Sequence, residues 1–565
     1  MRFLWLLFLA ASLPMWSQSN DSAAPPAINE TVPLPSDQYA LGEDSKPHAS
    51  VAAGKTFTFQ IADSKIFPGT ARTITVYIPA AYQGEKPACV YVGLDGLGFN
   101  AATVFDNLIA QHAMPVTIGI GVSPGNVGSA SSPDNPRFDR SLEFDSLNDR
   151  LVRFLLEEVL PEVERHPTPD GHAIKLSTNP NDRAIGGGST GAIAAFTVAW
   201  ERPDAFRRVF SAIGTYVGMR GGEQYYVLVR KTEPKPLRIF MQDGVHDEWP
   251  GGPEMGDWWM SNQTMNRALE FAGYDVRHVW GAGTHNGSQA AAVFPDAMRW
   301  LWRDWREPIR SQPPGNPVLK SIVAPGEDWE VEAQGCGSML AANPQGEIRC
   351  GESAALAFAA DGRSYQALPG GGVKVSGRAS ILSEDLDVHD LTVRNNGDMY
   401  AVTGSDLWLI RATGEKVKLD QGLKGASGVA LTPDGLWLFV AQRLSRSGLS
   451  YRVRSDGTLD ARAPFYDFDV PAWADDSGAA EIAMDRDGRA YVATRIGVQV
   501  FDRNGRVAAI LPLPGNAAAT GLCFGGKNFD TLYVAGGGKV YRRRLRVEGA
   551  PPWAAPAKLP PWGAG

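Results

Sequence analysis

The chain has 565 residues, enough for about three domains and too many for one. Hydrophobic residues make up 44% and charged residues 21%, which is ordinary globular usage and excludes a disordered or fibrous protein. The formal net charge is −8 and there is no run of Lys or Arg, so we expect no nucleic-acid partner and no attraction to anionic lipid. The 62 Gly and 40 Pro residues indicate many turns and short strands.

The N-terminal segment predicts export from the cytoplasm. Arg2 precedes an almost wholly apolar run over residues 3–16, which is too short for a bilayer core that needs about 20 residues. We interpret residues 1–17 as a secretory signal peptide, with an uncleaved anchor as the alternative. We therefore expect a secreted or periplasmic protein with no transmembrane segment after cleavage. Residues 18–48 are rich in Ser, Ala and Pro and are typical of a linker or a loosely attached arm.

Residues 49–309 alternate between strand-like and helical patterns. The predicted strands are 72–79, 88–94, 183–186, 237–241 and 274–280, and the predicted helices are 147–164, 190–201, 260–272 and 291–304. Strands that alternate with helices predict an α/β domain with a parallel central sheet flanked by helices.

A different pattern follows the Pro-rich linker at 310–325. Over residues 326–548, two alternating strands around a polar turn recur, with turn glycines at Gly362, Gly397, Gly435 and Gly488. Repeats of about 40 residues predict an all-β propeller, and a six-bladed ring would include the strand at 338–348. Residues 549–565 form a Pro-rich tail.

Four cysteines are too few for a disulfide scaffold. Cys336 and Cys350 would pair in an oxidising compartment, with free thiols as the alternative. Cys89 and Cys523 lie in apolar strand-like runs and are interpreted as small buried hydrophobic residues.

The sharpest motif is G-x-S-x-G at residues 187–191, directly after the strand at 183–186 and at the start of the helix at 190–201. A nucleophile elbow needs small neighbours because its Ser occupies a strained strand-to-helix turn. The start of the helix also favours developing negative charge. Ser189 is the predicted nucleophile, and an ordinary tight turn is the alternative.

In a hydrolase of this kind the acid and then the His follow the nucleophile. We assign the His to His285, in the loop after the last strand, as general base and then general acid. His278 alternates within a strand, and His246 comes too early in the chain. After the strand at 237–241 we favour Asp247 as the acid, then Asp243, then Glu248, because Asp247 lies past the glycine turn.

Two further groups of residues complete the predicted site. The oxyanion would be stabilised by the amide of Thr190 and by that of Leu97 or Gly96, in the glycine-rich loop after the strand at 88–94. Trp249, Trp258 and Trp259 follow the acid loop and would line an aromatic or sugar-binding cleft, with core packing as the alternative.

These motifs resemble the esterase family of α/β hydrolases that includes enterochelin, feruloyl and acetylxylan esterases and esterase D. The matching stretches are 64–82, 92–98, 140–145, 182–196, 238–249 and 280–287. The resemblance implies an α/β-hydrolase domain and hydrolysis of carboxylic esters through an acyl-enzyme, without metal or other cofactor. Its substrate would be a small-molecule or polysaccharide-linked ester, whose acyl and alcohol groups the resemblance does not fix.

The second half resembles the senescence marker protein and gluconolactonase family of six-bladed propellers. That family binds a divalent cation, often calcium, in its central channel. Glu352 fits the family's pattern, whereas His389-Asp390 stands where Asn-Asp is usual and Ala480-Glu481 where Asp-Gly is usual. The Asn-Gly before the third repeat has become Ser427-Gly428. If calcium binds, Glu352, His389 and Glu481 are its expected ligands.

The leading hypothesis is a secreted serine carboxylesterase with an accessory propeller. The second hypothesis is a calcium-dependent sugar lactonase that acts through the propeller, which the altered ligand positions disfavour. A binding protein that has lost both activities is the third, which the complete Ser, His and Asp set disfavours.

Overall fold

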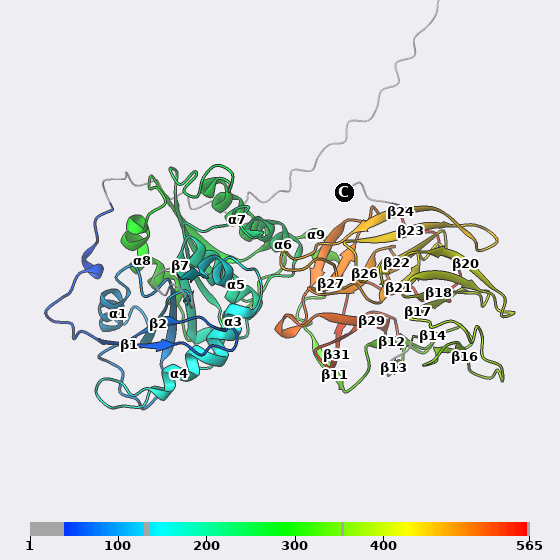
Figure 1. Ribbon diagram of the computed structural model, residues 1–565, viewed down its shortest axis with the longest axis horizontal. Coiled ribbons are helices and arrows are strands. Elements are labelled where there is room, and N and C mark those ends of the chain that lie inside the picture. Colours follow the sequence, from blue (N-terminus) through cyan, green and yellow to red (C-terminus); the bar gives the residue numbers. More distant parts are fainter. Residues whose placement is uncertain (1–38, 129–135, 352–354, 562–565) are drawn as a thin grey trace, which may run out of the picture.

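The structure is a computed structural model that describes residues 39–128, 136–351 and 355–561. Its first half contains one large sheet covered by helices, and its second half consists of small antiparallel sheets (Figure 1). The predicted signal peptide and Glu352 lie outside the described residues. Within the described ranges, no helix combines the length and apolar character needed to cross a bilayer.

The central sheet has eight strands in the order β1-β2-β4-β3-β7-β8-β9-β10. Their bounds are β1 Lys55–Ile61, β2 Arg72–Ile78, β3 Cys89–Leu94, β4 Thr117–Val122, β7 Arg183–Gly188, β8 Arg208–Ala212, β9 Arg238–Gly244 and β10 Asp275–Gly281. The strands from β4 to β10 run parallel, and β3, β4 and β8 are buried along their whole length. Burial on both faces explains why the sequence of β3 is a continuous apolar run.

The prediction of a parallel sheet is wrong at one edge, because β2 is antiparallel to both β1 and β4. The sheet is therefore mixed. Residues 62–71 and 79–88 connect β1 to β2 and β2 to β3 without a helix. A parallel crossover needs a dozen or more residues, usually including a helix, so these short connections reverse the chain instead.

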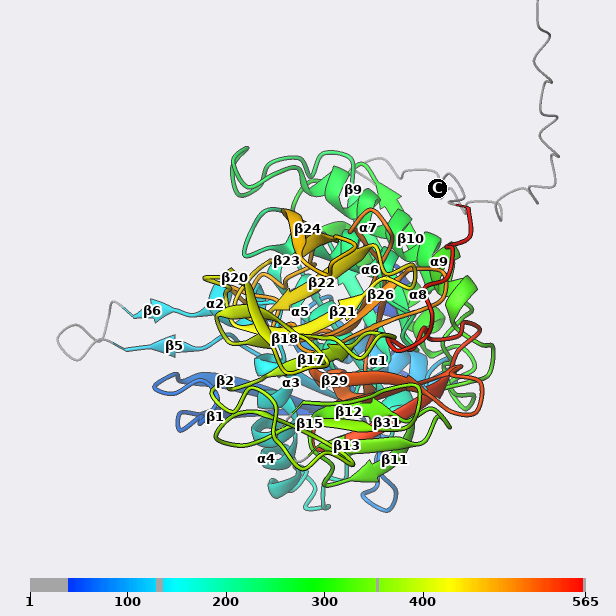
Figure 2. The same ribbon diagram turned by 90° about the vertical axis from the view of Figure 1, so that its right-hand side faces the viewer.

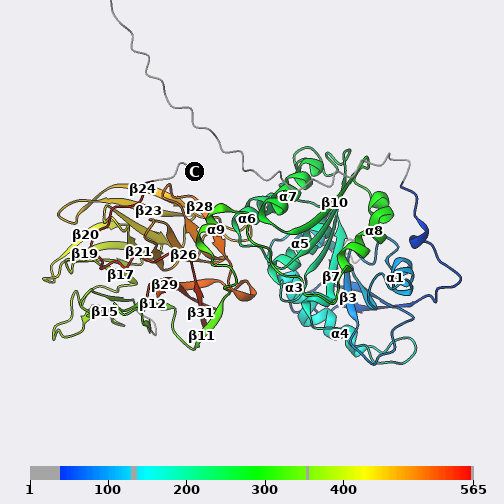
Figure 3. The same cartoon turned by 180° about the vertical axis from the view of Figure 1, so that it is seen from behind.

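Helices cover both faces of this sheet. Phe105 of α1 and Phe294 of α8 pack with Tyr91 on one face, and Phe154 of α3, Phe196 of α5 and Leu269 of α7 pack with Val92 on the other. The bounds are α1 Ala101–Ala110, α2 Arg140–Phe144, α3 Arg150–Phe154, α4 Leu160–Arg165, α5 Thr190–Glu201, α6 Tyr225–Lys231, α7 Trp258–Ala272 and α8 Gly287–Trp302. Seen from the front and from behind, α5 and α6 lie toward the second half of the chain and α1 and α8 away from it (Figures 1 and 3). A two-strand hairpin, β5 Asn126–Val127 with β6 Arg137–Phe138, stands apart from the sheet.

The second half is a β-propeller, seen in front in Figure 2. Five of its described sheets have three or four strands: β14-β15-β16, β17-β18-β19-β20, β21-β22-β23-β24, β25-β26-β27-β28 and β11-β31-β30-β29. Their bounds are β11 Glu330–Gln334, β14 Leu356–Phe358, β15 Ser364–Ala367, β16 Val373–Val375, β17 Asp390–Val393, β18 Met399–Thr403, β19 Asp406–Ile410, β20 Lys416–Gln421, β21 Ala426–Leu431, β22 Trp437–Gln442, β23 Ser447–Val453, β24 Leu459–Asp467, β25 Ile482–Met484, β26 Ala490–Thr494, β27 Gly497–Phe501, β28 Val507–Leu511, β29 Ala519–Gly525, β30 Thr531–Gly536 and β31 Lys539–Arg544.

The predicted count of six blades is wrong, because the described residues form five. Between the first and last blades lies only a two-stranded hairpin, β12 Met339–Ala342 with β13 Ile348–Gly351. The strand before it, β11, pairs with β31 and completes the last blade instead. Only residues 343–355 separate β12 from β14, which is too short a segment for the outer strands of a sixth blade.

Cys336 and Cys350 form a disulfide that ties the segment before β12 to β13, with their Cα atoms 5.8 Å apart. Cys89 is a free, buried thiol, and Cys523 is free and partly buried. The burial of Cys89 raises the pKa of its thiol to about 12, so it is an unreactive core residue.

The two halves touch through α6 and the residues that follow it. Lys231 Nζ lies 2.8 Å from an Asp469 carboxylate oxygen, and Arg543 contacts Glu233 at 2.6 Å. Lys235 Nζ donates to Asn516 Oδ1 at 3.0 Å. Within the predicted linker, helix α9 (Pro317–Ile322) packs Leu319 and Ile322 into the core of the second half. The exact domain boundaries stay a prediction.

Candidate active site

Ser189 lies between β7 and α5, at the carboxyl end of a central parallel strand. Its backbone angles are φ 57° and ψ −123°, a strained conformation for a residue with a side chain. Gly187 is required here, because a Cβ at this position would lie 2.7 Å from the Gly191 backbone. The glycines of the motif thus allow the sharp turn that presents the Ser189 hydroxyl.

The structure brings Ser189, His285 and Asp247 into one hydrogen-bonded chain. His285 Nε2 is 2.7 Å from Ser189 Oγ, and His285 Nδ1 is 2.8 and 2.9 Å from the two Asp247 carboxylate oxygens. An ionised carboxylate only accepts hydrogen bonds, so Nδ1 carries the proton and Nε2 accepts from the Ser189 hydroxyl. This is the tautomer that a general base for Ser189 needs.

Among the described residues, none of the other carboxylates and histidines considered from the sequence hydrogen-bonds to His285 or Ser189. Asp243 is buried at the end of β9, and the Glu248 side chain is part-exposed next to Asp247. His246 is exposed, whereas His278 is buried and stacks on Trp280 with ring centroids 4.7 Å apart. Burial lowers the pKa of His278, so this residue is a neutral packing group.

The loop after β3 lies beside the nucleophile. Asp95 and Gly96 have positive φ values of 65° and 98°, which fold the loop back over the sheet. The Gly96 amide donates to Val122 O at 3.3 Å. Since that amide is already used, the geometry favours Leu97 over Gly96 as the partner of Thr190 for an oxyanion. The carboxylate of Asp95 accepts both of its hydrogen bonds from Arg140, at 2.8 Å each, which fixes this loop to α2.

The three tryptophans differ in their surroundings. Trp258 is buried, lies edge-on to His285 with ring centroids 5.7 Å apart, and donates its indole N–H to Thr215 Oγ1 at 3.1 Å. Trp259 packs edge-on against Trp280. Trp249 is 58% exposed and Trp259 is partly exposed, so these two can contact a ligand from solvent.

Sequence analysis missed Thr215. Its Oγ1 lies 3.3 Å from Ser189 Oγ and accepts the Trp258 indole N–H at 3.1 Å, so Thr215 contacts Ser189, as His285 does. Thr215 follows the short strand β8, which was not recognised in the sequence, and a position directly after a parallel strand was the available signal.

Two of the three predicted calcium ligands, Glu481 and His389, lie in the described part of the propeller. The Glu481 carboxylate is buried and accepts hydrogen bonds from the Leu340 and Leu522 amides at 3.0 and 2.7 Å. The His389 side chain is 47% exposed and lies 3.6 Å from Asp387. No group of three metal-ligating side chains occurs among the described residues, which exclude Glu352. The calcium site therefore stays a prediction.

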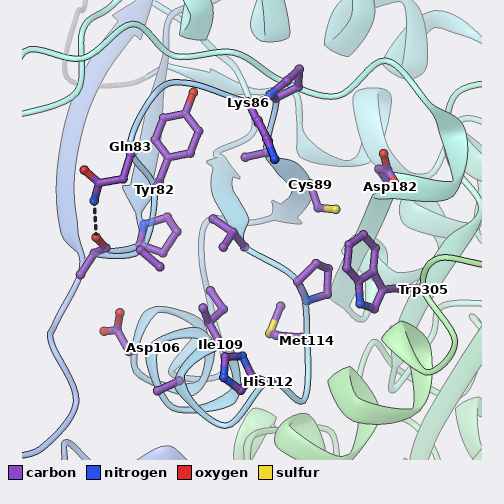
Figure 4. A pocket seen from close by; sticks show the side chains of 18 of the residues that line it. Tyr82, Gln83, Lys86, Cys89, Asp106, Ile109, His112, Met114, Asp182 and Trp305 are labelled. Carbon is purple, nitrogen blue, oxygen red and sulfur yellow. Dashed lines mark hydrogen bonds between the residues drawn. The ribbon is translucent and has the colours of Figure 1, made fainter.

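A cavity of about 950 Å³ lies away from this site (Figure 4). Cys89 at the start of β3, Asp182 just before β7, and Asp106 and His112 around the end of α1 are among its lining residues. It therefore opens at the amino ends of the parallel strands, whereas Ser189 lies at their carboxyl ends. Ligands of open α/β sheets bind at the carboxyl ends, so we do not assign substrate to this cavity.

A family model matches part of each half of the chain. A model of the family described as putative esterase matches residues 64–320, and a model described as SMP-30/Gluconolactonase/LRE-like region matches residues 372–537. The chain joins an esterase-family region to a gluconolactonase-like region. No curated protein matches the chain.

Solved structures similar to the chain come from both groups. A ferulic acid esterase is 16% identical, over 45% of this chain and 99% of its own, with a TM-score of 0.35. The enterobactin esterase of Shigella flexneri is 19% identical over 45% of this chain, with a TM-score of 0.33, and the match spans 60% of its length. A gluconolactonase from Xanthomonas campestris is 17% identical, over 41% of this chain and 93% of its own, with a TM-score of 0.36.

Proposed function

We propose that this chain is a serine carboxylesterase whose catalytic residues are Ser189, His285 and Asp247. The observation that carries the proposal is the hydrogen-bonded chain from the Asp247 carboxylate through His285 to Ser189 Oγ. The strained backbone of Ser189 and the match of this region to an esterase family agree with it.

In the first half of the proposed reaction, His285 Nε2 takes the proton of the Ser189 hydroxyl as Oγ attacks the ester carbonyl carbon. The Thr190 and Leu97 amides donate to the oxyanion that forms. As the tetrahedral intermediate collapses, the carbon–oxygen bond to the alcohol breaks, and His285 gives its proton to the departing alcohol. The acyl group is then bound to Ser189 Oγ as an ester.

In the second half, His285 takes a proton from a water molecule that attacks the acyl-enzyme. Collapse of the second intermediate releases the carboxylic acid, and the proton returns to Ser189. Throughout, Asp247 holds the imidazole by Nδ1 and stabilises its positive charge. Preorganised amide donors near the nucleophile supply the main stabilisation of the transition state.

The proposed substrates are esters of the enterochelin, feruloyl or acetyl type, either as small molecules or linked to a polysaccharide. We further propose that the protein acts after export, in the periplasm or outside the cell, and that the propeller is accessory. Trp249 supports an aromatic or sugar group in the substrate, because its side chain is exposed close to the acid loop.

Replacement of the nucleophile tests this proposal. Ser189→Ala should leave the thermal unfolding midpoint nearly unchanged and lower kcat for p-nitrophenyl acetate by on the order of 10⁴–10⁶. The matched control is Ser321→Ala on α9, at an exposed position far from the site, which should behave as wild type. Normal turnover by a folded Ser189→Ala protein would refute the assignment.

A further inference from the structure

A second carboxyl group, that of Asp243, lies beside the acid of the triad. Asp243 is near the end of β9 and Asp247 follows four residues later in the loop, and both side chains are wholly buried. The side chains of Asp247 and Asn262 both lie within hydrogen-bonding reach of the Asp243 carboxyl. Two ionised carboxylates at this separation in a buried site would repel each other strongly.

The hydrogen bonds around Asp243 leave one of its carboxyl oxygens without a donor, so that this oxygen can carry a proton. Asp243 Oδ1 accepts from the Gly244 amide at 2.7 Å, whereas its Oδ2 is buried without a donor among the described residues. A buried carboxylate oxygen without a donor is costly, but the same oxygen is satisfied as soon as it carries a hydrogen and donates.

The neighbouring amides do not supply this hydrogen. Asn262 of α7 donates its Nδ2 hydrogens to the carbonyl oxygens of Gly214 and Trp258, at 2.8 and 3.0 Å. Gln289 of α8 donates to the Asp243 backbone oxygen at 3.2 Å rather than to its side chain. No donor among the described residues is directed at Asp243 Oδ2, which favours a hydrogen on Asp243 itself.

The charges around Asp243 agree with a neutral carboxyl group. Burial and then the negative charge of Asp247 raise the pKa of Asp243 well above its usual range. Asp247 is the titratable group that faces it, with His285 on the far side of Asp247. Asp247 keeps the charge because both of its oxygens accept from His285 Nδ1.

We propose that Asp243 stays protonated in the resting enzyme and donates its carboxyl O–H to Asp247. This inference rests on the proposed esterase function, in which Asp243 is a positioning residue that acts through Asp247. Its hydrogen bond fixes the orientation of the Asp247 carboxylate toward Nδ1. Its neutrality leaves a single negative charge beside His285, so one carboxylate alone sets the basicity of the imidazole.

The decisive variant is Asp243→Asn, which replaces a neutral hydrogen-bond donor by another of similar shape. It should keep kcat/KM close to wild type and leave the acidic limb of the pH–kcat/KM profile unmoved. Asp243→Ala removes the donor and should lower kcat by about tenfold to a hundredfold. The matched control is Glu248→Gln, which alters the adjacent carboxylate and should leave both the rate and the profile unchanged.

An ionised Asp243 would give a different pH–kcat/KM profile for the Asp243→Asn variant. If Asp243 were ionised, Asp243→Asn would remove a negative charge near His285, lower the pKa of its imidazole and move the acidic limb to lower pH. That shift would overturn the proposal, as would an Asp243→Asn protein that is folded but as impaired as Asp243→Ala.

Infrared spectroscopy tests the protonation state without relying on activity. The wild-type minus Asp243→Asn difference spectrum at neutral pH should contain the carbonyl stretch of a neutral carboxylic acid, and Ser189→Ala should retain that band. Its absence overturns the proposal even if the enzyme is an esterase. If Ser189→Ala still hydrolyses esters and also shows the band, the proposed esterase mechanism is refuted, but the protonation of Asp243 is established.

Discussion

The proposed triad acid, Asp247, differs from the two other candidate carboxylates in its position and contacts. Asp243 lies within β9, where its Oδ1 already accepts from the next amide, and Glu248 is partly exposed. Asp247 comes after the turn at Gly244 and reaches back to His285. Position relative to the glycine turn thus agrees with the hydrogen bond between Asp247 and His285, and the role of Asp247 as the acid stays a prediction.

Replacement of Asp247 tests that selection. Asp247→Asn should lower kcat by on the order of 10⁴, because an amide at this position favours the imidazole tautomer that carries its proton on Nε2. The fold should persist, since the Asp247 and Asn side chains have nearly the same shape. The measurement is kcat at pH 7 with circular dichroism as the folding control. A decrease in kcat of less than about tenfold would mean that another residue is the acid of the triad.

The sequence could not predict the partners of these residues. The hydrogen bond from Trp258 to Thr215, and the burial of Asp243 between β9 and Asn262, depend on how α7 packs against the loop after β8. Such contacts join segments that are distant in the chain and leave no local pattern.

At the scale of elements, the predicted helix at 190–201 and the strands at 88–94 and 274–280 match α5, β3 and β10 to within a residue. The first two were predictable because β3 is a continuous apolar run and α5 is an Ala-rich segment that follows the glycine turn, and β10 was predictable from its alternating pattern. The predicted helix at 147–164 is instead α3, a π-helical turn at Leu155–Val159 and α4, with Pro161 at the start of α4. The antiparallel edge was missed because local patterns do not reveal which strand lies beside which.

The nucleophile elbow depends on the size of Gly187. In Gly187→Ala the added Cβ would lie 2.7 Å from the Gly191 backbone, so α5 and β7 would have to move apart. We expect a loss of stability of about 1–3 kcal/mol together with a strongly reduced kcat. The measurements are the free energy of unfolding in urea and turnover of p-nitrophenyl acetate. Gly42→Ala, where the added Cβ meets no atom within 4 Å, is the control, and equal behaviour of the two variants would contradict this account.

The repeat of the propeller could be predicted from the sequence, but the number of its blades could not. The Asp/Asn-Gly turns at Gly397, Gly435 and Gly488 lie between the inner two strands of their blades. The number of blades depends on the pairing of β11 with β31, which joins residues far apart in sequence.

At the scale of the whole molecule, the two halves share a polar interface that does not include the triad. Arg543, with a side chain 3% exposed, pairs with Glu233, and Lys235 donates to both Trp200 O and Asn516 Oδ1. Ser189, His285 and Asp247 all come from the first half. We therefore expect the interface to bear on stability, because all the proposed catalytic residues belong to the first half.

Removal of the propeller tests this division. A chain that ends at Arg310 should retain kcat/KM for p-nitrophenyl acetate, because it contains all the proposed catalytic groups. Its unfolding midpoint should fall, because Glu233 and Lys235 lose their partners. A truncated protein that is folded but inactive on this small ester would mean that the propeller completes the active site.

The central claim is that Ser189 forms the acyl-enzyme, and covalent labelling tests it most directly. The wild-type protein is treated with a fluorophosphonate ester, which reacts with the activated Ser of serine hydrolases, and the modified peptide is located by mass spectrometry. We predict one adduct, on Ser189, that forms in step with the loss of esterase activity and is absent from His285→Ala. Full inhibition with the adduct on another residue, or continued hydrolysis by a fully labelled protein, would contradict the account.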